Sequence, residues 1–162
     1  MTSPLPPRPH RRAVLALVAL VLAACGGGEP RVEVGAAQAS RPIAGSSQIV
    51  VTITNEGDGD DELLGGETPA ALAVELHRTV IEDGQASMVQ LDGLEVPAGG
   101  SVRFRPGDLH LMLVVPDETV VPGGTFDLTL RFDRSGEVTV PVEVVELLDL
   151  VEDAPDPEAT AS

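Results

Sequence analysis

Tryptophan, tyrosine and lysine are absent from this sequence, and cysteine occurs once, at position 25. Without Trp or Tyr, and with only three Phe, the chain has no aromatic platform on which bases or sugars would stack. Its charge is strongly acidic, with 26 Asp and Glu against 10 Arg and a net charge of −16. Binding of nucleic acid or of anionic lipid through a basic patch is therefore excluded.

The N-terminus has the pattern of a bacterial lipoprotein signal. Arg8, Arg11 and Arg12 precede an apolar run that is too short for a permanent membrane span. The run ends in "LAAC", which resembles a lipobox, so we expect 1–24 to be a signal peptide cleaved before Cys25. The alternative is an ordinary secreted protein that happens to have Cys25 at this position. The lipobox predicts a lipidated Cys25, a flexible tether over 25–30 and a chain anchored by lipid alone to the extracytoplasmic face of the membrane.

Loss of the signal changes what the remaining chain can do. Seven Arg then stand against all 26 Asp and Glu, which gives a net charge of −19 and favours a cationic partner. No thiol is left for a disulfide or a thiolate metal ligand. A blue-copper electron-transfer centre, which needs a Cys thiolate beside two His, is therefore excluded.

The pattern from 31 to 148 is that of one all-β domain. Short apolar segments with a period of two are separated by Gly, Pro, Asp and Asn, and no window sustains helical periodicity beside a cap. Such segments predict an antiparallel Greek-key sandwich or barrel. The clearest expected strands are 48–54, 71–80, 86–91, 101–105, 110–115, 125–132 and 137–144, with weaker ones near 32 and near 61. Residues 149–162 are acidic and Pro-containing, and we expect them to form a disordered tail.

An acidic turn near Asp58, Asp60 and Asp61 is a second candidate ion site. It lacks the full spacing of a calcium loop, so a solvated turn is the preferred interpretation.

The expected mature chain keeps only two His and two Met, since His10 and Met1 belong to the signal. An Asp83-Gly84 turn between 71–80 and 86–91 would place Met88 opposite Thr79 and diagonal to His77, on one face. His110 and Met112 share a face by simple alternation. A one-residue change in the turn would put Met88 on the other face.

These four side chains predict a site for a soft metal ion. Two thioethers and two imidazoles suit Cu(I), whereas zinc favours thiolate or carboxylate ligands and calcium favours oxygen. The alternative is a structural or adhesive immunoglobulin-like lipoprotein in which the same residues only pack, since a Met at strand spacing usually fills a core. No GxSxG nucleophile motif is present, and we expect a binding protein and not an enzyme.

The segment "ELHRTVIEDGQASMVQLDGLEVPAGGSVRFRPGDLHLMLV" (75–114) closely resembles the PCuAC family of periplasmic and lipid-anchored copper chaperones. That family has a His, ten residues, a Met, twenty-one residues, a His, one residue and a Met, and the same gaps separate His77, Met88, His110 and Met112 here. The likeness covers roughly 45 to 145. One departure is Leu109, where the family often has an aromatic residue; it leaves the four motif residues intact.

The resemblance implies a cupredoxin-like Greek-key fold and a Cu(I) site formed by His77, Met88, His110 and Met112. It also implies capture of copper outside the cytoplasm and delivery towards the dinuclear copper centre of cytochrome oxidase. The expected partners are therefore the copper ion and a copper-accepting oxidase subunit or another copper chaperone.

Overall fold

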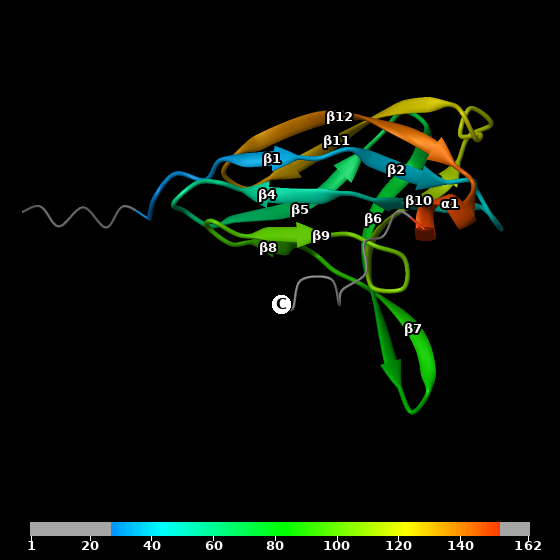
Figure 1. Ribbon diagram of the computed structural model, residues 1–162, viewed down its shortest axis with the longest axis horizontal. Helices are drawn as coiled ribbons and strands as arrows, with labels where there is room; N and C mark the ends of the chain where they lie inside the picture. The colour runs from blue at the N-terminus through cyan, green and yellow to red at the C-terminus, as the bar shows by residue number, and fades with distance from the viewer. Residues whose placement is uncertain (1–26, 153–162) are drawn as a thin grey trace, which may run out of the picture.

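The computed structural model describes residues 27–152, which fold into twelve strands and one short helix (Figure 1). The elements are β1 (Val32–Val34), β2 (Ala37–Ser40), β3 (Ser46–Val50), β4 (Thr52–Asn55), β5 (Asp61–Glu67), β6 (Ala71–Glu82), β7 (Gln85–Gln90), β8 (Leu94–Val96), β9 (Ser101–Arg103), β10 (Leu109–Pro116), β11 (Thr125–Phe132), β12 (Gly136–Val145) and α1 (Leu147–Glu152). The expected signal peptide, Cys25 and most of the expected tail lie outside the described residues.

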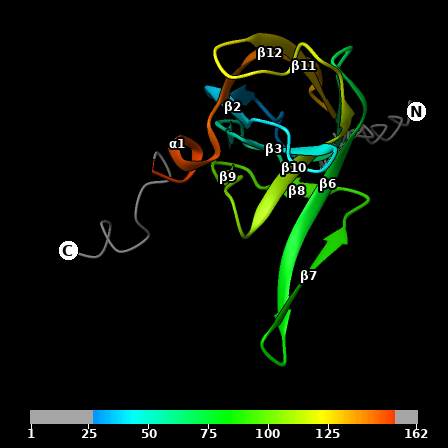
Figure 2. The ribbon, with the colours of Figure 1, turned by 90° about the vertical axis from the view of Figure 1, so that its right-hand side faces the viewer.

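Seven strands close into a barrel in the order β6-β10-β3-β2-β12-β11-β5, because β5 pairs back with β6 at Gly66 and Val74. All neighbours in this ring are antiparallel except β12 and β2. The strands β1, β4 and β9 form a separate small sheet. Figure 2 shows the ring of strands with the β6–β7 hairpin projecting from it. The predicted all-β barrel with non-sequential, Greek-key neighbours is confirmed.

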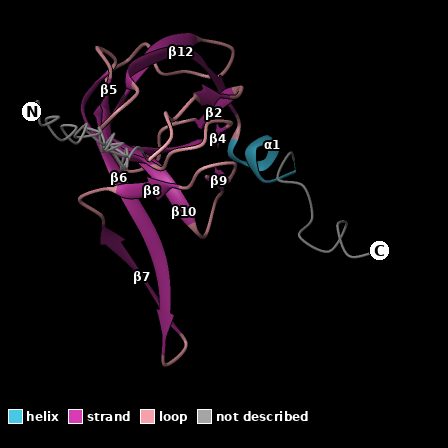
Figure 3. Cartoon of the chain, turned by 90° about the vertical axis from the view of Figure 1, so that its left-hand side faces the viewer, coloured by secondary structure: helices cyan, strands magenta, loops and turns pink. Residues whose placement is uncertain are grey.

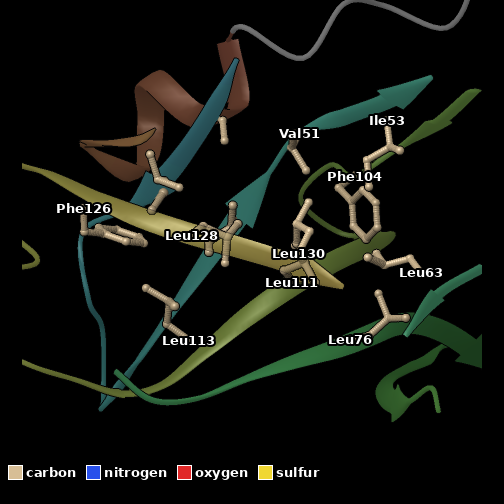
Figure 4. Close-up of a cluster of buried hydrophobic side chains, with 14 of the residues drawn as sticks. Val51, Ile53, Leu63, Leu76, Phe104, Leu111, Leu113, Phe126, Leu128 and Leu130 are labelled. Atoms are coloured by element: carbon tan, nitrogen blue, oxygen red, sulfur yellow. The ribbon is translucent and has the colours of Figure 1, made fainter. Parts of the chain in front are cut away.

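Aliphatic side chains fill the interior, as the period-two pattern predicts. Leu111 and Leu113 of β10 and Leu128 and Leu130 of β11 are fully buried (Figure 4). Each such Leu contributes about 1.5–3 kcal/mol relative to an exposed side chain. Truncation of Leu111 to Ala would lower the free energy of unfolding by about 2–5 kcal/mol, because the surrounding core would relax only partly into the cavity left behind.

Asn55, at the end of β4, is a buried polar residue with all its hydrogen bonds made. Its Nδ2 donates to the carbonyls of Gly59 (2.8 Å) and Val96 (3.1 Å), and its Oδ1 accepts from the amides of Arg31 (3.0 Å) and Gly57 (3.0 Å). The side chain therefore joins the start of the domain to the acidic turn and to β8.

The acidic turn and Arg134, in the β11–β12 turn, contact the segment that we expected to be a flexible tether. Arg134 donates to the Gly28 carbonyl (2.9 Å), and the Asp58 amide donates to the Glu29 carbonyl (3.1 Å). The chains approach so closely that a Cβ at Gly59 would collide with the Gly28 carbonyl. The prediction of a flexible tether is therefore wrong for residues 28–30, which lie against the barrel.

Two further local predictions need correction, and one strand was not predicted. The expected strand 48–54 is two strands, β3 and β4, in different sheets, with Val51 between them. The short strand β8 was not expected. The disordered tail expected from 149 is wrong for 149–152, because α1 is helical and Leu150 is 1% exposed. Within residues 27–152, no helix has the length and apolar character needed to cross a bilayer.

Candidate metal centre

Three neighbouring strands, β7, β6 and β10, hold the four residues that the sequence singled out. Thr79 pairs with Met88, as predicted, and His77 pairs with Gln90. The turn is Asp83-Gly84, whose φ angles of 51° and 78° are both positive, as a two-residue type I′ hairpin requires. The predicted hairpin register is therefore confirmed, and Met88 lies diagonal to His77 on the same face.

His77 and His110 are direct cross-strand partners on β6 and β10. Their ring centroids lie 5.8 Å apart, with an interplanar angle of 68°. Met112 follows on β10, on the face of His110 and opposite Glu75. The alternate residues of β10, Leu109, Leu111 and Leu113, point into the core. The strand pairing thus brings the two imidazoles and the two thioethers to one face of three adjacent strands.

The ring of His110 is fully buried and fixed by the segment that precedes it. Its Nδ1 lies 3.1 Å from the Asp108 carbonyl. A carbonyl oxygen only accepts, so Nδ1 carries the proton and Nε2 keeps its lone pair. Nε2 is buried and has no hydrogen-bond partner in the described structure. The Asp108 carbonyl also accepts the Thr79 amide (3.0 Å), which holds this segment against β6.

His77 repeats this arrangement with a side-chain acceptor. Its Nε2 lies 2.9 Å from Oε2 of Glu75, a half-buried residue two positions earlier on β6. A carboxylate at this distance favours a proton on Nε2, which leaves the lone pair on Nδ1. Nδ1 is buried, and no hydrogen-bond partner for it is found in the described residues. Each ring therefore has one nitrogen tied to an acceptor and one buried nitrogen free to bind a metal.

Electrostatics favour the neutral, metal-binding form of His110. Burial lowers the pKa of its imidazole below the ordinary value, and the neighbouring His77 ring lowers it further, whereas the hydrogen bond to the Asp108 carbonyl acts in the opposite direction. The net direction is downward, so His110 is neutral at neutral pH.

The two thioethers are more accessible than the imidazoles. Met88 is 57% exposed on the projecting hairpin, and Met112 is half-buried. A side chain this exposed does not fill a core, so packing alone does not account for Met88. Solvent exposure therefore increases from the two buried imidazole rings to the half-buried Met112 and then to the exposed Met88.

The acidic turn does not form a comparable site. The Asp60 carboxylate accepts the Ala98 amide, and that of Asp61 accepts the amides of Glu62, Arg134 and Ser135. Burial opposes ionisation of Asp61, but the hydrogen bonds to its carboxylate outweigh it and lower its pKa. Over residues 27–152, no group of three or more His, Cys, Asp or Glu is arranged to hold a metal ion. These carboxylates therefore stabilise the turn.

Sequence reasoning missed the two groups that orient the rings, Glu75 and the Asp108 carbonyl. Both stand two residues before a His. In a strand, residues i and i−2 share a face, so Glu75 could have been identified as a partner of His77. The role of Asp108 depends on the bend of the backbone before β10, which alternation does not reveal.

Comparison with known proteins places the chain in a family. The family model described as "Putative lipoprotein LpqE-like" matches residues 31–144. The chain belongs to this LpqE-like family. It is 30% identical over 115 residues to the protein named "Putative lipoprotein Lxx21020" of Leifsonia xyli, and the match covers 69% of each chain. It is 28% identical over 100 residues to protein RP573 of Rickettsia prowazekii, which covers 61% of this chain and 55% of that one.

Solved PCuAC domains share this fold. The copper-bound PCuAC domain from PmoF2 superposes with a TM-score of 0.60 at 23% identity, over 71% of this LpqE-like chain and 92% of that one. The Cu(I) form of DR1885 from Deinococcus radiodurans gives a TM-score of 0.58 at 24% identity, over 71% of this chain and 78% of that one. The expected cupredoxin-like fold is confirmed, and the PCuAC resemblance holds at the level of the fold.

Proposed function

We propose that this LpqE-like protein is an extracytoplasmic, lipid-anchored Cu(I) chaperone whose cargo is held by His77, Met88, His110 and Met112. One observation carries the proposal. The two imidazoles are cross-strand neighbours on β6 and β10, on the face that also bears both thioethers. Each ring has a buried nitrogen that lacks a hydrogen-bond partner in the described residues.

The donor set determines the metal. Thioether sulfur is a soft, uncharged ligand that suits Cu(I) and gives little to zinc, calcium or magnesium. Glu75 is directed to the ring of His77, which makes it an orienting group and not an oxygen ligand. The PCuAC domain of PmoF2 and DR1885, which share the fold, were both solved with copper bound, and this supports the same cargo here.

A chaperone must also release its cargo. Neutral ligands hold Cu(I) without a thiolate, so an acceptor with stronger ligands can remove it by exchange. The exposed Met88 gives such an acceptor a ligand to replace first. By resemblance to the PCuAC family, we propose delivery towards the dinuclear copper centre of cytochrome oxidase, through an oxidase subunit or another copper chaperone.

The location rests on Cys25, which lies outside the described residues. The lipobox before it and the lipoprotein names of the family and of the Leifsonia relative support a lipid anchor at the extracytoplasmic face of the membrane.

Competition for Cu(I) against a coloured chelator tests the binding. Removal of one buried imidazole nitrogen, in His77→Ala or His110→Ala, should lower the Cu(I) affinity by more than about tenfold, because loss of a group that merely orients a ligand already costs about that much. Arg78→Gln is the matched control, because Arg78 follows His77 on the other face of β6. A wild-type chain that leaves all copper with the chelator would refute the proposal. Transfer to a copper-free oxidase domain with the dinuclear site, followed by its visible absorption, tests the delivery step.

A further inference from the structure

The β6–β7 hairpin extends well beyond the barrel, and β7 is its outer strand (Figure 3). All six residues of β7 are exposed. In the described part of the chain, β6 is the only strand that pairs with β7, so its other side is a free edge. Natural sheets usually protect such an edge with a charge, a Pro or a bulge. The sequence of β7, "QASMVQ", has none of these.

The hydrogen bonds show which backbone groups of β7 point outward. The Leu91 amide donates to the Leu76 carbonyl (2.8 Å), which makes these two residues a hydrogen-bonded pair of the antiparallel ladder. Such pairs alternate along the ladder, so residues 85, 87 and 89 also bond towards β6. The amides and carbonyls of Ala86, Met88 and Gln90 therefore face the free edge.

The same residues place their side chains on the face of the copper site. Ala86, Met88 and Gln90 share this face with Thr79 and Ile81 of β6. None of the five is charged, and Ile81 is 73% exposed. The charged side chains Arg78 and Glu82 lie on the opposite face.

Acidic residues flank this uncharged strip. Asp83 lies in the turn at the tip of the hairpin, next to Glu82 of the opposite face, and Asp92 lies just beyond the base of the hairpin. A second copy of the chain paired along β7 would bring acidic groups against acidic groups in a molecule that is already strongly negative. A segment with basic ends and an uncharged centre complements the strip.

We propose that β7 receives the copper acceptor by strand addition. The occupant is an extended partner segment, basic at both ends and uncharged at its centre, that carries a soft ligand. It hydrogen-bonds to the outward groups of Ala86, Met88 and Gln90 and sets its ligand beside Met88. This mode of recognition gives affinity through the main chain and specificity through alternate side chains. The inference rests on the proposed function only for its copper step, since strand addition needs no metal.

Two probe peptides separate these steps. The capped peptide Lys-Val-Thr-Ser-Thr-Val-Lys tests addition to the copper-free full chain in detergent micelles. We expect it to protect the amides of residues 86, 88 and 90 from hydrogen exchange by at least about tenfold, the effect of about one hydrogen bond each. The same peptide with Glu for Lys should protect them less. Equal protection by both peptides, or none by either, would overturn the proposal. Protection that occurs without peptide and grows with protein concentration would also overturn it, because it would show that β7 pairs with a second copy of the chain.

The peptide Lys-Val-Thr-Cys-Thr-Val-Lys tests the copper step. Ala86→Pro removes one outward amide and no bond to β6, a change that an edge strand tolerates. It should leave Cu(I) affinity unchanged and slow transfer to the Cys peptide by about tenfold relative to Ala86→Val, which keeps the amide. Equal transfer rates would overturn the inference. A chain that takes up no Cu(I) would refute the proposed function alone, because the amide protection would still decide on strand addition.

Discussion

Glu75 and His77 lie two residues apart on β6, and the Oε2 of the first is 2.9 Å from the Nε2 of the second. This contact fixes the ring and leaves Nδ1 without a hydrogen-bond partner in the described residues. The centroid of the His77 ring lies 5.8 Å from that of His110. The Asp108 carbonyl does the same for His110 from its own i−2 position. Both rings are thus oriented by the strand or loop that immediately precedes them.

Glu75→Gln should weaken Cu(I) binding without removing a ligand. The amide is a poorer partner for Nε2–H than the carboxylate, so the ring is less firmly oriented. We expect a loss of about tenfold or more in affinity, the usual effect of a group that orients a metal ligand. Chelator competition measures it. Glu82→Gln on the same strand is the control, and equal affinities in the two variants would argue against the orienting role.

Acid should destabilise the copper-free protein through His110. Burial holds the pKa of His110 below its ordinary value of 6.5; the hydrogen bond to the Asp108 carbonyl opposes this shift, and the nearby His77 ring adds to it. The unfolded chain therefore binds more protons than the folded one as pH falls below about 6.5, and stability decreases until the pH passes the lower, folded-state pKa. Urea unfolding midpoints at about pH 7.5 and about pH 5 should differ more in wild type than in His110→Gln. An identical pH dependence in both proteins would show that His110 is not the group responsible.

The hairpin register shows how much of the site could be predicted from sequence. Asp83-Gly84 takes positive φ at both residues, a local requirement that the two residue types meet, and the pairing of Thr79 with Met88 follows from it. Alternation alone places His110 and Met112 together. The direct pairing of His77 with His110 could not be predicted, because it depends on how β10 aligns with β6 across a long intervening segment.

The other features that the sequence did not predict also depend on tertiary contacts. Val51 looks like the middle of one strand, but the chain passes there from the barrel to the small sheet. The helix α1 has only six residues and no N-cap signal, and it is held by burial of Leu150 and not by intrinsic propensity. The contacts of Gly28 and Glu29 with Arg134 and Asp58 join distant parts of the sequence. Local patterns do not encode such tertiary contacts.

Asn55→Ala should be strongly destabilising. It removes four hydrogen bonds and leaves the buried amides and carbonyls that made them without partners. We expect a loss of about 3 kcal/mol or more in the free energy of unfolding, since each buried unpaired group costs about 1–3 kcal/mol. Urea denaturation provides the measurement. The control is Glu56→Ala, at the exposed neighbouring residue, which should change the free energy of unfolding by less than about 0.5 kcal/mol. An equally small effect of Asn55→Ala would contradict the role assigned to this network.

Cys25→Ser should abolish lipidation and leave uncleaved precursor or mislocalised protein. Incorporation of labelled fatty acid and membrane fractionation measure the two effects. Gly27→Ser is a suitable control, because a Cβ at Gly27 meets no atom within 4 Å. Normal lipidation and membrane retention of Cys25→Ser would mean that the lipobox interpretation is wrong.

X-ray absorption at the copper edge tests the ligand set most directly. For the Cu(I)-loaded wild-type chain, we predict a first shell that needs both nitrogen and sulfur scatterers, from His77, His110, Met88 and Met112. In the double variant Met88→Leu/Met112→Leu, the sulfur contribution should disappear, while the free energy of unfolding changes by less than about 1.5 kcal/mol because Leu conserves volume and apolarity. A wild-type shell of nitrogen and oxygen alone, unchanged by loss of the two Met, would contradict the proposed Cu(I) centre.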